Sequence, residues 1–234
     1  MSDRSAFPTT QATWLATLVG DEVASANTTQ TAEMARVFVM ERYAGPLAVF
    51  VRGSSLARVG EPADIVNGFF AARLSDADFL RAWHRSGMRL RRWLMNGILF
   101  YGQGLARDRA RASGRSAMLP ANEWSKLEGD AATAELDFER AWAVAVVREA
   151  TARAEDELRD EGRTVEFEIF RRHAIDGKPY AAFARELGRS EQQCAGATRL
   201  VAQRVRARLA ELLLEEGVPE GELDEEIARV RAAL

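Results

Sequence analysis

Apolar residues recur along this chain at intervals of three and four positions, and the strict alternation of a half-buried strand is almost absent. One series consists of Phe138, Trp142, Val146, Ala150 and Ala154. A second series contains Cys194, Ala197, Val201, Val205, Leu209 and Leu212. Both series have the period of a helix with one buried face. The pattern therefore predicts an all-α protein.

Glycine, proline and small polar residues divide this pattern into expected elements. In the first half we expect helices over 32–54, 62–74 and 75–113, the last broken near Gly87. In the second half we expect helices over 135–160, 164–175, 179–187, 190–216 and, at the end, 223–233. The expected organisation is an N-terminal extension (1–30), a helical domain (31–113), a flexible linker (114–134), a second helical domain (135–216) and an acidic tail (217–234).

Charged residues are sorted into blocks that the formal net charge of −3 conceals. Residues 81–115 hold nine arginines against one acidic residue, and 171–210 hold nine basic residues against three acidic ones. The stretches 116–170 and 211–234 are acidic, with fourteen acidic residues against six basic and eight against two. The planar guanidinium of arginine suits phosphates and base edges. The blocks favour two polyanion-binding surfaces, and solvated helix faces of mixed charge are the alternative.

The most specific local pattern is the segment from Tyr180 to Gln193. A short helix that turns Phe183 inward would end at Gly188, and Ser190 with Gln193 would form a capping box for the next helix. The outward face of that helix would carry Gln192, Ala195, Gly196, Arg199, Gln203 and Arg206. Basic residues that could neutralise phosphates surround it: Arg171, Arg172, Lys178, Arg185, Arg189 and Arg204. This is typical of a helix-turn-helix that reads the major groove, although a plain helix pair joined by glycine has the same pattern.

The first basic block interleaves aromatic side chains with arginines. Trp93, Phe100 and Tyr101 lie among them, with Asn96 and Gln103 as polar neighbours. Bases of single-stranded nucleic acid stack on such rings beside a cationic track. The alternative is that the aromatic residues belong to the core.

Composition excludes several classes of site. One cysteine and two histidines argue against a disulfide framework, a thiolate zinc site and a histidine metal centre. We expect Cys194 to be a small buried residue. No long apolar run and no signal-peptide pattern is present, so we expect a cytoplasmic protein without a membrane partner. No nucleophile–base pair or phosphate-binding glycine loop is recognisable, so we expect neither an enzyme nor a cofactor.

The basic, aromatic segment followed by the helix-turn-helix pattern resembles the bacterial RNA polymerase sigma factors of the extracytoplasmic-function type. Further segments are similar to parts of that family: the opening Phe7-Pro-Thr-Thr10, the polymerase-gripping segment 61–74, the end of the promoter-melting helix at 106–112, and the acidic close at 221–234. The resemblance covers nearly the whole chain.

The resemblance implies three groups of site residues. Those for contact with the polymerase are Asp64, Asn67, Phe69 and Phe70. Those for the inner promoter element are Arg91, Arg92, Trp93, Asn96, Tyr101, Arg107, Arg109 and Arg111. Those for the outer promoter element are Arg189, Ser190, Gln192, Gln193, Arg199, Gln203 and Arg204.

The chain also departs from the family pattern. Asn67 stands where relatives have glutamine, and Ala195 and Gly196 stand where they commonly have lysine and an aliphatic residue. Leu200 occupies a position where arginine is common. Glycines at 97, 102 and 104 lie in a helix that relatives keep regular.

The implied function is that of a sigma factor that binds core RNA polymerase and directs it to promoter DNA, with an anti-sigma factor as a further candidate partner. Two alternatives stay open. One is a degenerate sigma-like adaptor that does not melt promoters. The other is a stand-alone helix-turn-helix repressor. The opposite charges of the tail and the second domain raise the question whether the tail docks there.

Overall fold

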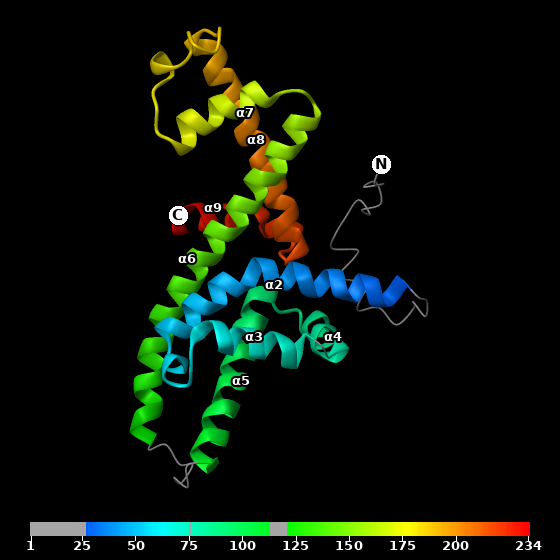
Figure 1. Ribbon diagram of the computed structural model, residues 1–234, viewed down its shortest axis with the longest axis vertical. Helices are drawn as coiled ribbons and strands as arrows, with labels where there is room; N and C mark the ends of the chain where they lie inside the picture. Colours follow the sequence, from blue (N-terminus) through cyan, green and yellow to red (C-terminus); the bar gives the residue numbers. More distant parts are fainter. Residues whose placement is uncertain (1–26, 75, 113–120) are drawn as a thin grey trace. The chain divides into compact units, whose positions relative to one another are not determined.

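The computed structural model describes residues 27–74, 76–112 and 121–234, and every regular element in these ranges is helical (Figure 1). The all-α prediction is confirmed for this part of the chain. Most of the expected N-terminal extension, including Phe7–Thr10, lies outside the described residues.

Five elements make up the first part of the chain: α2 (Asn27–Gly53), a 3-10 turn η1 (Ser55–Arg58), α3 (Pro62–Arg73), α4 (Ala77–Ser86) and α5 (Leu90–Ala112). Helix α2 packs against α3 and α5, and α3 packs against α5. The buried side chains between them include Leu47, Phe69, Leu94 and Ile98. These apolar positions follow the predicted helical spacing.

The expected break near Gly87 separates α4 from α5. Gly87 has a φ of 65°, a conformation that is unfavourable for residues with a Cβ atom. Asp76 caps the start of α4 by accepting a hydrogen bond from the backbone of Asp78 (2.9 Å). The indole of Trp83 donates to the Met88 carbonyl (2.7 Å) across the break. The predicted break is confirmed.

Helix α6 (Ala121–Asp160) begins well before the expected start of a helix at 135. Residues 114–120 of the expected linker lie outside the described residues, whereas 121–134 are helical. Alanine occurs four times and glutamate twice in this stretch, and both have high helix propensity, so its polar character did not exclude a helix.

Contacts between residues divide the chain into two compact units. Unit 1 is Met1–Ala145 together with Leu214–Leu234, and unit 2 is Val146–Leu213. The second unit therefore begins later than the predicted limit of 135, because Ala134 and Phe138 of α6 pack on α2. Ala134 lies 3.2 Å from the position that a Cβ atom on Gly53 would occupy, and the Phe50 and Phe138 rings meet edge to face at 6.2 Å.

Unit 2 contains the rest of α6, α7 (Thr164–Phe170), a π-helical turn η2 (Arg171–Ile175), a 3-10 turn η3 (Tyr180–Ala182) and most of α8 (Glu191–Glu215). One core cluster consists of Ile169, Phe183, Ala184 and Cys194, and a second of Leu158, Phe167 and Val201. The thiol of Cys194 is buried and unbonded, as predicted, and burial raises its pKa.

The expected helix over 179–187 is instead the single turn η3 followed by hydrogen-bonded turns as far as Gly188. Only eight residues lie between Pro179 and Gly188, and the structure closes them with turns, whereas the seven residues of α7 form a regular helix. Phe183 nevertheless lies in the core, as predicted.

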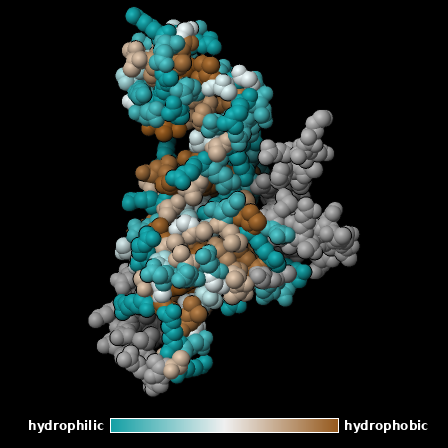
Figure 2. All heavy atoms as spheres, in the orientation of Figure 1, coloured by the Kyte–Doolittle hydropathy of each residue, from teal (hydrophilic) through white to brown (hydrophobic). Residues whose placement is uncertain are grey.

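The acidic tail belongs to unit 1. It forms a 3-10 turn η4 (Glu220–Glu222) and α9 (Leu223–Ala233), which matches the predicted final helix. Val218 and Val230 are buried. Hydrophilic residues cover most of the surface visible in Figure 2, and hydrophobic ones form smaller patches.

Candidate nucleic-acid interface

The start of α8 is fixed by two sets of hydrogen bonds. Gly188 has a φ of 64°, and the backbone N–H groups of Gly188 and Arg189 donate to the carbonyls of Arg185 (3.1 Å) and Ala184 (2.9 Å). This is the Schellman pattern. The Gln193 backbone then donates to the Ser190 hydroxyl (3.2 Å), and the Ser190 backbone donates to the Gln193 side chain (2.8 Å). The predicted capping box is confirmed.

Six of the seven residues predicted for the outer promoter element are exposed, either at this helix start or farther along α8: Arg189, Ser190, Gln192, Gln193, Arg199 and Gln203. Arg189 and Arg199 form no ion pair with any described residue. Ser190 and Gln193 also serve the capping box, so only part of their hydrogen-bonding capacity stays available. The exposed groups can donate to phosphates and base edges.

The seventh residue, Arg204, is half-buried and bound within unit 2. It pairs with Glu157 (3.4 Å) and Glu161 (2.8 Å) of α6 and the residues after it. These contacts hold α8 against α6, and they occupy the guanidinium that sequence analysis assigned to DNA.

Two further arginines expected to neutralise phosphates are also paired. Arg171 and Arg172 both donate to Glu168 (2.8 and 2.6 Å), and Arg172 reaches Glu186 (2.9 Å) before the Gly188 turn. The hydrogen bonds from the two guanidinium groups lower the pKa of Glu168 from 4.5 to about 2. In the described structure Arg172 connects η2 to α7 and to the turn before α8, whereas Arg171 pairs with Glu168 of α7 and with Asp176.

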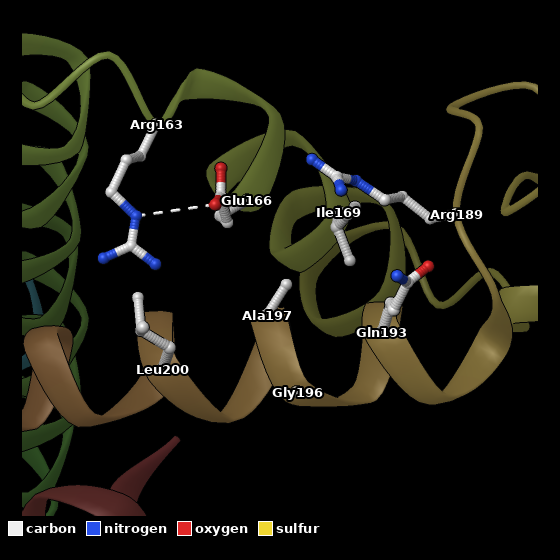
Figure 3. Close-up of a pocket in the computed structure, with 8 residues that line it drawn as sticks. All are labelled: Arg163, Glu166, Ile169, Arg189, Gln193, Gly196, Ala197 and Leu200. Atoms are coloured by element: carbon white, nitrogen blue, oxygen red, sulfur yellow. Dashed lines mark hydrogen bonds and ion pairs between the residues drawn. The ribbon is translucent and has the colours of Figure 1, made fainter.

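A shallow hollow of about 230 Å³ lies between α7 and the start of α8 (Figure 3). Gln193 and Ala197 of α8 point toward it, and Gly196 leaves its floor open. Arg163 and Glu166 pair at one end (3.4 Å), and Arg189 lies at the other. The hollow carries a single unpaired guanidinium and no enclosed polar group, so it is a feature of the surface rather than an enclosed pocket.

The start of α5 differs from the predicted open arginine surface. Arg91 is only 6% exposed, lies over the Trp142 ring (4.2 Å) and pairs with Glu139 (3.1 Å) and Glu226 (2.5 Å). Arg92 pairs with Glu135. In this structure acidic side chains from α6 and α9 bury and occupy the Arg91 guanidinium, whereas the Arg92 side chain stays about half exposed beside its single partner from α6.

The middle of α5 turns its aromatic residues partly into the core. Trp93 packs on Phe79 (5.6 Å between centroids) and Tyr101 on Phe69 (6.1 Å). Asn96 is half-buried and lies near the sulfur of Met88 (3.6 Å). Trp93, Asn96 and Tyr101 therefore present only part of each side chain to solvent.

Phe100 behaves differently from its neighbours. It is 66% exposed, although its spacing from Trp93 was equally consistent with a place in the core. An exposed phenyl ring on an arginine-rich helix can stack with a base.

The end of α5 agrees with the predicted interface. Arg107, Arg109 and Arg111 are exposed. The closest carboxylate is that of Asp108, which lies 3.6 Å from Arg111. Among the described residues, Arg107 donates to the Gln103 carbonyl (3.2 Å) and to no carboxylate. This end of the helix is the strongest cationic surface on α5.

The four residues predicted to contact polymerase fall into two classes. Asp64 and Asn67 are exposed on α3. Phe69 and Phe70 are 0% and 2% exposed and belong to the core, where Phe69 contacts Phe70, Phe79 and Tyr101. The paired aromatic residues therefore stabilise the unit rather than present a surface to a partner.

Two of the three glycines on α5 are packing positions. A Cβ atom on Gly102 would lie 2.4 Å from Leu56, and one on Gly97 would lie 3.0 Å from Phe69. Only Gly104 has open space around it. Gly97 and Gly102, which sequence analysis noted as departures from the family pattern, thus permit close approach of α5 to its neighbours.

Sequence analysis missed the polar contacts of the tail. Glu216 is fully buried and accepts hydrogen bonds from the Trp142 indole (3.0 Å) and from Arg42 (3.4 Å). Glu215 also pairs with Arg42 (3.4 Å), whose guanidinium lies over Phe38 (3.9 Å). The acidic block beside basic blocks in the sequence indicated that the tail would pair with arginines, but it did not specify which arginines.

No family model, curated protein or solved structure matches this chain. None of the helices in 27–74, 76–112 and 121–234 combines the length and apolar character needed to cross a bilayer. Within the same ranges no three metal-binding side chains gather at one point.

Proposed function

We propose that this protein is a sigma-type initiation factor that binds core RNA polymerase and directs it to promoter DNA. The observation that carries the proposal is the capped start of α8, which presents Arg189, Gln192, Arg199 and Gln203 to solvent. The first turn is held by Ser190, so these groups are preorganised. A helix of this kind fits the major groove, where arginine and glutamine bind guanine and adenine edges.

The end of α5 supports contact with the inner promoter element. Arg107, Arg109 and Arg111 would bind phosphates, and Phe100 offers a ring for stacking with an unpaired base. Contact with polymerase would rest on Asp64 and Asn67. The buried pair Phe69 and Phe70 has no direct part in it.

The proposal is tested by run-off transcription with purified core polymerase on fragments of the source genome. R107A/R109A should reduce promoter-dependent product by about tenfold or more, because each lost hydrogen bond to a charged phosphate is worth about 1.5–3 kcal/mol. The matched control is R52A/R58A, which removes two exposed arginines of the same unit outside the predicted interface.

Equal losses in both double variants would count against the promoter contact. Tight binding to core polymerase with no promoter-dependent product from the unmodified chain would instead identify the sigma-like adaptor.

A second candidate is a duplex-binding regulator that acts through unit 2 alone. Two observations favour it. Phe69 and Phe70, which were assigned to polymerase contact, are buried. Arg91 and Arg92, which were assigned to the inner promoter element, pair with carboxylates of the same unit. It predicts tight duplex binding by the free protein, with a logarithmic salt slope of about −0.9 for each phosphate contacted. An electrophoretic shift with and without core polymerase separates the two, because a sigma factor requires the polymerase.

A further inference from the structure

The first residues of α5 and the acidic tail are joined by a group of ion pairs. Glu226 is 1% exposed and accepts hydrogen bonds from Arg89 (2.7 Å) and Arg91 (2.5 Å). Glu222 accepts a second bond from Arg89 (2.9 Å). We call Leu214–Leu234 the C-terminal segment; its carboxylates occupy both guanidinium groups.

We propose that Arg89 and Arg91 form a phosphate-binding surface for a nucleic-acid strand, and that the C-terminal segment covers this surface until the strand displaces it. The inference rests on the nucleic-acid part of the proposed function. It does not require polymerase.

The chemistry of the two arginines fits phosphate as well as carboxylate. A guanidinium presents its donors in a planar fork that binds either group through paired hydrogen bonds. Arg91 is confined between Trp142 and the acidic residues, so it cannot reach solvent by a simple change of rotamer. A buried guanidinium that loses its partner is strongly unfavourable. The C-terminal segment is therefore expected to leave only when another anion takes its place.

The position of Arg91 on α5, and of Arg89 directly before it, indicates which anion could compete. The same helix ends in Arg107, Arg109 and Arg111, which are exposed, and Phe100 lies between the two groups. Arg91 and Arg107 are separated by about 24 Å along the helix axis. A strand bound at the exposed end would hold its next phosphates at high effective concentration near Arg89 and Arg91.

The C-terminal segment itself has the charge of a polyanion, since residues 211–234 hold eight acidic residues against two basic ones. Val218 and Val230 anchor it through apolar contacts. These contacts oppose displacement of the C-terminal segment by small anions. Only a strand that already binds elsewhere on α5 is expected to displace it.

The main test compares two double variants of the full chain that remove the same charge. E222Q/E226Q removes the carboxylates of the C-terminal segment that bind Arg89 and Arg91, and leaves Glu139 of α6 in contact with Arg91. E220Q/E225Q removes two exposed carboxylates of the same segment, of which only Glu225 forms an ion pair, with Arg229 (3.3 Å). The probe is a short, fluorescein-labelled single-stranded DNA, and binding is followed by anisotropy over a series of salt concentrations.

E222Q/E226Q should bind this DNA about tenfold more tightly than the unmodified chain at low salt, with a slope steeper by about 0.7 for each phosphate gained. E220Q/E225Q should bind within about twofold of the unmodified chain, because its lost charges do not face the arginines. Equal changes in the two variants, or no change in either, overturn the inference.

A second measurement uses the unmodified chain and applies if circular dichroism shows that E222Q/E226Q does not fold. Saturation with the same DNA should accelerate amide hydrogen exchange in α9, because the strand displaces it. Unchanged or slower exchange in α9 under saturation overturns the inference.

Run-off transcription separates this inference from the proposed function. Tighter binding by E222Q/E226Q without any run-off product keeps the covered phosphate surface and rejects the sigma factor. Run-off product from the unmodified chain, with no difference in DNA binding between the two double variants, keeps the sigma factor and rejects the covered phosphate surface.

Discussion

Helices α5 and α8 both begin within arginine-rich stretches, yet their first turns differ in electrostatic surroundings. At the start of α5, Arg89 and Arg91 are covered by acidic side chains that arrive from α6 and from the end of the chain. Arg189, two residues before α8, and Arg199, farther along it, are exposed and have no carboxylate partner among the described residues. Arginine density in the sequence therefore indicates a nucleic-acid surface only where folding brings no carboxylate to it.

The largest effect is expected from breaking the internal pairing of unit 1. Glu216→Ala leaves the Trp142 indole without its acceptor and weakens the pairing of the buried Arg42. Removal of one partner from a buried ion pair costs about 3–5 kcal/mol. Urea unfolding followed by tryptophan fluorescence measures the loss in free energy of unfolding.

Glu220→Ala is the control for this substitution, because Glu220 is exposed in the same segment. It should change the free energy of unfolding by less than about 0.5 kcal/mol. A similar small change for Glu216→Ala would mean that the tail does not pack on unit 1 in solution.

A smaller effect of opposite sign in the two helices is expected from glycine substitution. Gly102→Ala would force Leu56 to move, since the new Cβ would lie 2.4 Å from it, and should destabilise unit 1 by about 1–3 kcal/mol. Gly196→Ala meets no atom within 4 Å and should stabilise α8 by about 0.5–1 kcal/mol. Thermal unfolding of both variants measures the difference, and stabilisation by Gly102→Ala would contradict the packing of α5 described above.

The smallest effect concerns pH and the paired arginines of unit 2. Because Arg171 and Arg172 lower the pKa of Glu168 from 4.5 to about 2, the folded state binds this proton less readily than the unfolded state. The stabilisation from Glu168 is therefore fully present above pH 4.5 and is lost as the pH falls toward 2. Glu168→Gln should remove this part of the acid dependence, as measured by urea unfolding from pH 7 to 3. An unchanged pH profile in Glu168→Gln would show that the pairs do not persist in solution.

Much of the local structure followed from residue pattern. Gly87 predicted the break between α4 and α5, Gly188 the turn before α8, and Ser190 with Gln193 the capping box. Each of these depends on backbone conformation or on hydrogen bonds within a few residues, so short-range sequence determines it. The prediction of a helix over 179–187 was wrong, because the backbone forms a single 3-10 turn followed by hydrogen-bonded turns there.

The candidate site was predictable only in part. Exposure of Arg189 and Arg199 agreed with the helical period, whereas Phe69 and Phe70 were assigned to a surface and lie in the core. Two large aromatic residues at adjacent positions do not specify which neighbour covers them. That depends on α2 and α5, which pack on α3 from distant parts of the chain.

The sequence by itself determined the helical class, most helix limits and the capped start of α8, because these follow from periodicity, caps and glycine conformation. Only the tertiary structure decided that α6 contributes to the cores of both units, and that the acidic tail packs on α5 rather than on the second basic block. Charge attraction acts between any acidic and basic stretch and carries little direction. Burial of Glu216, Val218 and Val230 against complementary shapes selects one position for the tail.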